Sequence, residues 1–302
     1  MPKPLKTEAS TRLAERYKKL TGMITWLMAQ HITASTSMGL KIMEREEFNI
    51  RNTVQILMKD IQDTPLSLQF LYSRDILSIL VDKKTLLQWY TLVRDDAVKQ
   101  KLQNAQQYTK LYATLLNELA TLYASSLETQ KATTYLEEVL ELCKNVKYDL
   151  SEAKAEVLLV TGKLSSEAAK SVDYFNKSHE IGVSTNNLLV QALAKEQIGL
   201  SSMYNNKTAA AEYFQKTLDI YSKLGNEYEC MRQTMFIGAA ESTMKQYPVA
   251  KIKYELALNL ARGLGDCYME LEIYHHLANV YKNLMEYTKA INYFELCLTY
   301  RR

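Results

Sequence analysis

The chain has 302 residues, of which 47% are hydrophobic and 24% are charged, and 37 basic against 34 acidic residues leave a net charge of +3. This balance argues against a dedicated nucleic-acid-binding surface, and the hydrophobic share is sufficient for a large core or a long stacked array. Only nine Gly and four Pro are present. Because strand-and-turn folds need these residues at their many turns, the composition favours an all-α protein.

The first 105 residues have helical patterns that do not clearly repeat. The segment 63–65 (Asp-Thr-Pro) is a helix-break signal, because proline is tolerated in the first turn of the next helix. The segment 82–85 (Asp-Lys-Lys-Thr) reads as a polar turn. We therefore expect residues 1–105 to form an N-terminal helical region of irregular or degenerate repeats. Apolar stripes predict its helices within 13–28, 47–61, 66–81 and 86–93.

The clearest pattern lies near the end of the chain, between Tyr274 and Cys297. Large and small residues alternate there at spacings that let two helices approach closely, with large side chains filling the space beside small ones. The residues that carry this pattern are Leu277, Ala278, Tyr281, Tyr287, Ala290, Phe294 and Cys297. The segment resembles the tetratricopeptide repeat, which has large, small and aromatic residues in that order.

Weaker copies of the pattern precede it at steps of roughly 37 to 42 residues, a longer period than the basic repeat. Five units cover residues 106–302, and glycines 162, 199 and 238 take the small position in three of them. Gly225 and Gly265 each follow a second helix, where a left-handed cap is expected. The resemblance implies a right-handed α-α superhelical solenoid of tetratricopeptide-like helix pairs over these five repeats.

A second resemblance lies in the N-terminal region. Residues 47–51 read Glu-Phe-Asn-Ile-Arg and lead into an apolar helix. This is similar to the entry into the C-terminal helical sensor arm of signal-transducing (STAND) nucleotidases. The resemblance implies that the chain is such an arm without its motor domain.

The sequence contains no pattern that predicts chemistry. Thr161-Gly162-Lys163 lacks the upstream glycine and the following hydroxyl of a phosphate-binding loop. His275 and His276 are adjacent, so on a helix they point about 100° apart and cannot jointly hold one metal ion. We therefore expect no enzymatic activity, no cofactor and no metal.

The four cysteines (Cys143, Cys230, Cys267 and Cys297) are far apart and read as reduced residues of an intracellular protein. No apolar run reaches the length of about 18 residues that a membrane span needs. The first ten residues also lack the apolar stretch of a signal peptide. These features predict a cytoplasmic protein that does not enter a membrane.

The tetratricopeptide resemblance also implies a binding surface, because in this family the first helix of each pair lines a concave groove. The residues expected to meet a ligand are Glu272, His275, Asn279, Lys282 and Asn283 of the last unit, with Met235 and Asn117 at the position equivalent to His275 in earlier units. The amide of Asn279 can both donate to and accept from the backbone of an extended peptide.

The leading prediction is a non-catalytic protein–protein interaction module that holds a peptide or helix of a partner protein in this groove. One alternative is a regulatory sensor, either the repeat arm of a signal-transducing nucleotidase or a peptide-pheromone receptor. Another is a structural scaffold that self-associates, so a homo-oligomer is possible. In each case the expected partner is a protein or peptide and not a nucleic acid.

Overall fold

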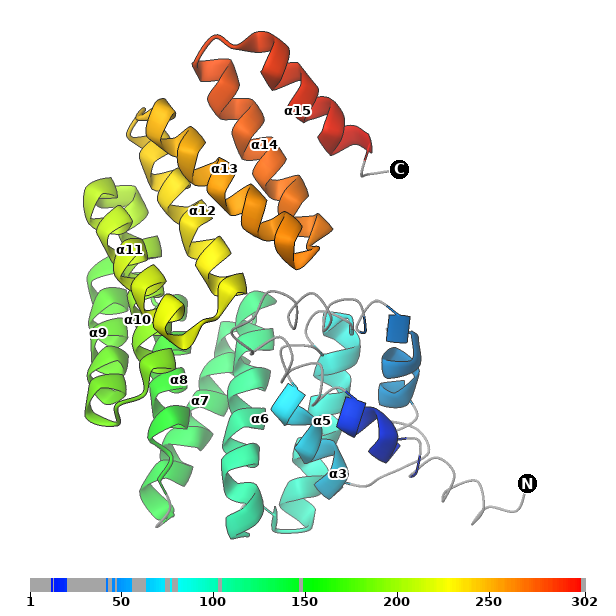
Figure 1. Ribbon diagram of the computed structural model, residues 1–302. Helices are drawn as coiled ribbons and strands as arrows, with labels where there is room; N and C mark the ends of the chain where they lie inside the picture. The colour runs from blue at the N-terminus through cyan, green and yellow to red at the C-terminus, as the bar shows by residue number, and fades with distance from the viewer. Residues whose placement is uncertain are drawn as a thin grey trace. The chain divides into compact units, whose positions relative to one another are not determined.

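The computed structural model describes residues 12, 14–20, 42, 45–46, 48–55, 64–73, 77, 81–102, 105–146 and 149–299. Within these ranges every secondary-structure element is a helix, which confirms the predicted all-α class (Figure 1). None of these helices combines the length and the apolar character that crossing a membrane requires. Parts of the predicted helices at 13–28, 47–61 and 66–81 lie outside the described residues, as does Glu47 of the STAND-like segment.

The described residues divide into two compact units, and the division falls between Ser166 and Glu167. The first unit contains α3 (Thr64–Gln69), η1 (Phe70–Ser73), α5 (Lys83–Lys99), α6 (Gln106–Ser125), α7 (Thr129–Asn145) and α8 (Ser151–Leu164). The boundary expected at residue 105 follows the repeat pattern and stays a prediction.

Helix α5 begins earlier than the sequence pattern indicates. The segment 82–85 is not a turn: Asp82 caps the helix by accepting a hydrogen bond from the backbone N–H of Thr85 at 2.9 Å. An aspartate cap satisfies an otherwise unpaired N–H, so the polar residues after it become the first helical turn. The helix then continues to Lys99, beyond the expected end at residue 93.

A polar contact ties three helices of the first unit together. Glu138 of α7 accepts a hydrogen bond from the hydroxyl of Tyr112 on α6 at 2.5 Å and from Nη2 of Arg94 on α5 at 2.8 Å. Burial and this carboxylate raise the pKa of the Tyr112 hydroxyl. A partly buried carboxylate with two donors fixes the relative register of the helices that supply them.

The second unit is a series of helices in which each one packs against the next (Figure 1). It contains α9 (Ala168–Ser184), α10 (Leu188–Asn205), α11 (Lys207–Leu224), α12 (Glu227–Thr243), α13 (Tyr247–Leu264), α14 (Cys267–Asn283) and α15 (Tyr287–Thr299). The helix pairs expected from the last three repeats are therefore present. Gly225 and Gly265 end α11 and α13 with φ of 60° and 75°, the left-handed caps that the sequence predicts.

Two glycines explain how closely the helices of a pair approach. A Cβ atom on Gly199 would lie 2.8 Å from Cε1 of Phe214, and one on Gly238 would lie 3.1 Å from the ring of Tyr254. Both rings are buried. The small position of the repeat is thus small because an aromatic ring of the second helix lies directly on the backbone of the first. Gly162, also buried, lies within α8 and not in a loop.

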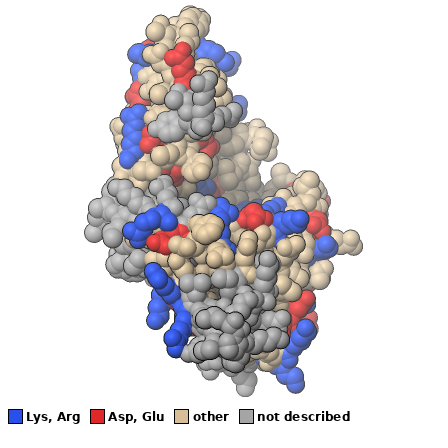
Figure 2. Space-filling view, turned by 90° about the vertical axis from the view of Figure 1, so that its right-hand side faces the viewer, with Lys and Arg blue, Asp and Glu red and all other residues tan. Residues whose placement is uncertain are grey.

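Charged side chains of both signs are interspersed on the face shown in Figure 2, and neither sign forms one continuous area there. Charged side chains also pair within one helix turn, such as Lys131 with Glu128 and Lys289 with Glu286, each at 2.6 Å. Exposed pairs of this kind contribute little to stability.

Candidate protein-binding surface

One face of α14 carries a row of polar side chains. The helix is held by its Asp266 cap, which accepts from the backbone N–H of Met269 at 3.0 Å, and by a buried face that includes Leu277 and Tyr281. With that face turned inward, the helical period directs another set of residues outward. The residues of this set are exposed or half-buried: Glu272, His275, Asn279, Lys282 and Asn283. We call these five residues the α14 polar row.

The two asparagine amides of the α14 polar row donate to backbone carbonyl oxygens of their own helix. Nδ2 of Asn279 donates to the carbonyl oxygen of His275 at 3.0 Å and lies 3.2 Å from Nε2 of that histidine. Nδ2 of Asn283 donates to the carbonyl oxygen of Asn279 at 2.8 Å. Among the described residues no group donates to the side-chain oxygen of either asparagine. The row therefore presents two acceptors one helical turn apart.

The two residues predicted from earlier units lie inside the structure. Met235 is 4% exposed and Asn117 is 2% exposed. Nδ2 of Asn117 donates to the carbonyl oxygen of Ala153 at 3.1 Å and to Oε2 of Glu156 at 3.0 Å, both on α8. The same repeat position is therefore exposed in the last unit, at His275, but covered in the earlier unit, at Asn117. The covering element there is α8, the first helix of the following pair. We leave Met235 and Asn117 out of the proposed surface.

A buried ionic cluster lies between α10 and α12, and the repeat pattern of the sequence does not predict it. Nε2 of Gln233 donates to Oε2 of Glu196 at 2.5 Å, and Nη2 of Arg232 lies 3.5 Å from Oε1 of Glu196. Arg232 also donates through Nη1 to both carboxylate oxygens of Glu229, at 2.7 and 2.8 Å. Burial alone would lower the pKa of Arg232, but the charges of Glu229 and Glu196 outweigh it and raise the pKa. Arg232 is therefore a cation already neutralised within the protein. Glu196 lies one repeat before Met235, so within its own unit it holds nearly the position that His275 holds in the last unit. Aligning the units with one another is therefore the signal that finds it.

The two adjacent histidines make different ring contacts. His276 stacks on Tyr254 with 5.0 Å between ring centroids, and burial lowers the pKa of His276, whereas His275 lies beside Phe294 with 6.0 Å between centroids. Across the described ranges no group of three or more His, Cys, Asp or Glu side chains is arranged to hold a metal ion.

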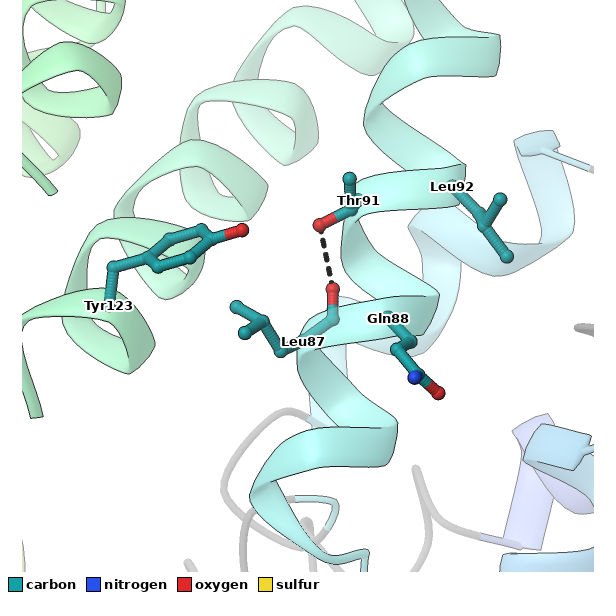
Figure 3. A pocket seen from close by; sticks show the side chains of 5 residues that line it. All are labelled: Leu87, Gln88, Thr91, Leu92 and Tyr123. Atoms are coloured by element: carbon teal, nitrogen blue, oxygen red, sulfur yellow. Dashed lines mark hydrogen bonds between the residues drawn. The ribbon is translucent and has the colours of Figure 1, made fainter. Parts of the chain in front are cut away.

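The first unit contains a shallow pocket between α5 and α6 (Figure 3). Its volume is about 400 Å³, and it is lined by Leu87, Gln88, Thr91, Leu92 and Tyr123. Thr91 donates its hydroxyl to the carbonyl oxygen of Leu87 at 2.7 Å, as Figure 3 shows, which leaves mainly apolar walls. Tyr123 stacks on Tyr135 of α7 at 5.6 Å, and Nζ of Lys131 lies 5.1 Å from its ring centroid.

Tyr281 of the second unit occupies the same place in its helix pair as Tyr123. It stacks on Tyr293 at 5.5 Å, with Nζ of Lys289 5.2 Å from its ring centroid. The two tyrosines differ in what the preceding helix supplies. Tyr281 donates its hydroxyl to Oε1 of Glu255 on α13 at 2.8 Å, whereas no described residue accepts a hydrogen bond from Tyr123. The pocket lies where the preceding helix, α5, has no carboxylate that could accept a hydrogen bond from Tyr123.

This difference predicts unequal effects of removing the two hydroxyl groups. Tyr281→Phe should lower the free energy of unfolding by about 1.5–3 kcal/mol, because it leaves the carboxylate of Glu255 without its donor. Tyr123→Phe removes no such bond and should change it by less than about 0.5 kcal/mol. Urea unfolding of the two variants gives the comparison, and equal losses would contradict it.

Comparison with known proteins places the fold. Residues 271–302, which span most of α14 and all of α15, match the family model described as "Tetratricopeptide repeat". This last helix pair is a tetratricopeptide-like repeat. No curated protein matches it in sequence.

Three solved structures resemble this chain. BtubC (BKLC) from P. vanneervenii superposes with a TM-score of 0.63 at 14% identity, over 73% of this chain and 91% of that one. A STAND protein with a tetratricopeptide repeat sensor from Pyrococcus horikoshii gives 0.54 at 17% identity, over 100% of this chain and 54% of that one. Aspartyl phosphate phosphatase F from Bacillus subtilis gives 0.52 at 11% identity, over 96% and 94%. The chain thus spans about half the length of the STAND protein. At such identities the likeness concerns the fold.

Proposed function

We propose that the chain is a non-catalytic protein-interaction module whose α14 polar row binds an extended peptide segment of a partner protein. The observation that carries the proposal is the pair of amide oxygens of Asn279 and Asn283, to which no described residue donates a hydrogen bond. Tetratricopeptide-like repeats commonly serve as scaffolds for recognition, and the row consists of exposed and half-buried residues of α14.

The geometry of the row suits an extended backbone. The two asparagines are one turn apart, about 5–6 Å along the axis, and successive N–H groups on one side of an extended chain are about 6.6–7 Å apart. The two oxygens can therefore accept from two N–H groups of one peptide. Glu272 and Lys282 lie near opposite ends of the row, about 15 Å apart at 1.5 Å per residue.

The charges at the two ends favour one orientation of the peptide. A basic side chain is expected near Glu272 and an acidic one near Lys282, separated by about four or five residues of extended chain. The neutralised Arg232 adds no further cation. The proposed partner segment is therefore short, extended and of mixed charge, and not uniformly acidic.

The test is the recovery of partner proteins from the native source by the full chain and by its variants. The double substitution Asn279→Ala, Asn283→Ala should reduce recovery about tenfold or more, since each lost hydrogen bond contributes roughly 1 kcal/mol. Asn259→Ala, which removes an exposed asparagine from α13, is the matched control and should have no effect. Equal recovery by the double variant and the wild type would refute the assignment of the row.

A second candidate function is a regulatory sensor arm. We propose it because the STAND protein that resembles the whole chain carries a tetratricopeptide repeat sensor. The full reading frame and the neighbouring genes provide the test. A nucleotidase domain encoded upstream would support the arm, and a short gene for a secreted peptide would support the predicted peptide-pheromone receptor. If neither is found, the interaction module alone is favoured.

A further inference from the structure

An apolar stripe runs along the outer face of α15. It consists of Tyr287, Ile291, Phe294 and Leu298, spaced as a helix spaces residues on one face, and we call it the α15 stripe. Tyr287 is 58% exposed, Ile291 56% and Leu298 65%, while Phe294 is half-buried. Isolated exposed apolar residues need no explanation, but four on one helical face form a surface that can bind another helix.

On the preceding second helix, the equivalents of the last two residues of the stripe are buried. Forty residues before Phe294 and Leu298 are Tyr254 and Leu258 of α13. These two side chains are 1% and 3% exposed, and α14 packs against α13. The same face of α11 carries Phe214, which is fully buried, and α12 packs against α11. In this solenoid the first helix that follows therefore packs on the part of the second helix that corresponds to Phe294 and Leu298.

Each of these junctions is marked by one pair of rings. Phe236 of α12 lies on Phe214 of α11 with 5.3 Å between ring centroids, and His276 of α14 stacks on Tyr254 of α13 at 5.0 Å. In both pairs the incoming ring comes from the first helix that follows, 22 residues later in the chain. Phe294 is the third aromatic of this series. Within the described part of the chain its ring meets His275 of its own pair, with 6.0 Å between centroids.

We propose that the α15 stripe docks one amphipathic helix of a partner protein, which places an aromatic side chain against Phe294 and aliphatic side chains against Ile291 and Leu298. The stripe continues an interface that the chain itself builds twice, between α11 and α12 and between α13 and α14, and this continuity identifies the occupant as a helix of the first-helix type. The stripe contains no charged residue, so apolar burial drives the docking.

This site is separate from the α14 polar row. The row offers hydrogen-bond acceptors to an extended peptide, whereas the stripe offers an apolar seat to a helix. The two surfaces adjoin at His275, whose ring touches Phe294. One partner can therefore engage both with a helix followed by an extended segment, but the two sites are tested independently.

The chain supplies its own probe for the proposed site. A synthetic peptide with the sequence of α14, residues 267–283 with Cys267→Ser, carries the helix face that covers the equivalent stripe of α13. Labelled with a fluorophore and titrated with the full chain, it should bind saturably, and Leu298→Lys in the chain should weaken binding at least tenfold. Ile252→Lys is the matched control, because Ile252 is 61% exposed on α13 but lies outside the equivalent face.

Further measurements distinguish the proposed helix-docking site from the alternatives. A peptide with His276→Ala should bind more weakly, since it lacks the ring for Phe294, and a chain with Asn279→Ala and Asn283→Ala should bind the peptide as the wild type does. Absence of saturable binding, or equal weakening by Ile252→Lys, would overturn the proposal. Light scattering that shows dimers of the wild type, abolished by Ile291→Lys, would also overturn it, because the occupant would then be a second copy of the chain.

Discussion

Replacing Phe214 with alanine is expected to lower the free energy of unfolding by about 3–5 kcal/mol. The ring is fully buried, packs on Phe236 at 5.3 Å and lies directly against the backbone of α10 at Gly199. Its removal opens a cavity at the junction of three helices. Urea unfolding followed by circular dichroism at 222 nm measures the loss.

A second substitution tests whether the close approach at Gly199 explains this cost. Gly199→Ala alone should destabilise by about 1–3 kcal/mol through overpacking, partly offset by up to about 1 kcal/mol of helix propensity. In the Phe214→Ala background the added methyl group keeps only its close approach to Cβ of Tyr213, at 3.2 Å, so most of its cost should be lost. The expected coupling between the two sites is about 1–3 kcal/mol. Additive effects would show that the ring does not press on the glycine.

Glu196→Ala is expected to destabilise by about 2–4 kcal/mol. The substitution removes the acceptor of a 2.5 Å hydrogen bond and leaves the amide of Gln233, fully buried, without its partner. Oε1 of Gln233 already has no hydrogen-bond partner in the described structure. The substitution would therefore remove the one hydrogen bond that the side chain of Gln233 makes there. An unpaired buried amide costs about 1–3 kcal/mol, and the nearby charge of Arg232 adds to this.

Two variants provide the controls for Glu196. Glu196→Gln keeps an acceptor and should recover most of the lost stability. Glu212→Ala removes an exposed carboxylate from α11 and should stay within about 0.5 kcal/mol of the wild type. A Glu196→Ala variant as stable as the wild type would contradict a structural role for the cluster.

The sequence pattern predicts those features that one helix pair determines by itself. The small residues at Gly199 and Gly238 and the caps at Gly225 and Gly265 follow from contacts inside a pair or from one backbone conformation, and each is found. The start of α5 at Lys83 follows from a single aspartate cap, which composition alone reads as a turn.

Features that depend on a helix outside the pair cannot be read in this way. Asn117 and His275 hold equivalent positions, yet the first is buried under α8 and the second is exposed. Helical periodicity assigns both to the same face, but it does not say whether a later helix covers that face. Tyr123 and Tyr281 show the same dependence, since only Tyr281 meets a carboxylate of the preceding helix among the described residues.

The central claim is that the α14 polar row contacts a partner protein, and site-specific crosslinking in the native source tests it most directly. A photo-crosslinking amino acid placed at residue 283 should capture a partner that the same group at residue 259 on α13 does not, and Asn279→Ala should reduce the capture. Capture from residue 259 alone, or capture from residue 283 that Asn279→Ala leaves unchanged, would contradict the claim.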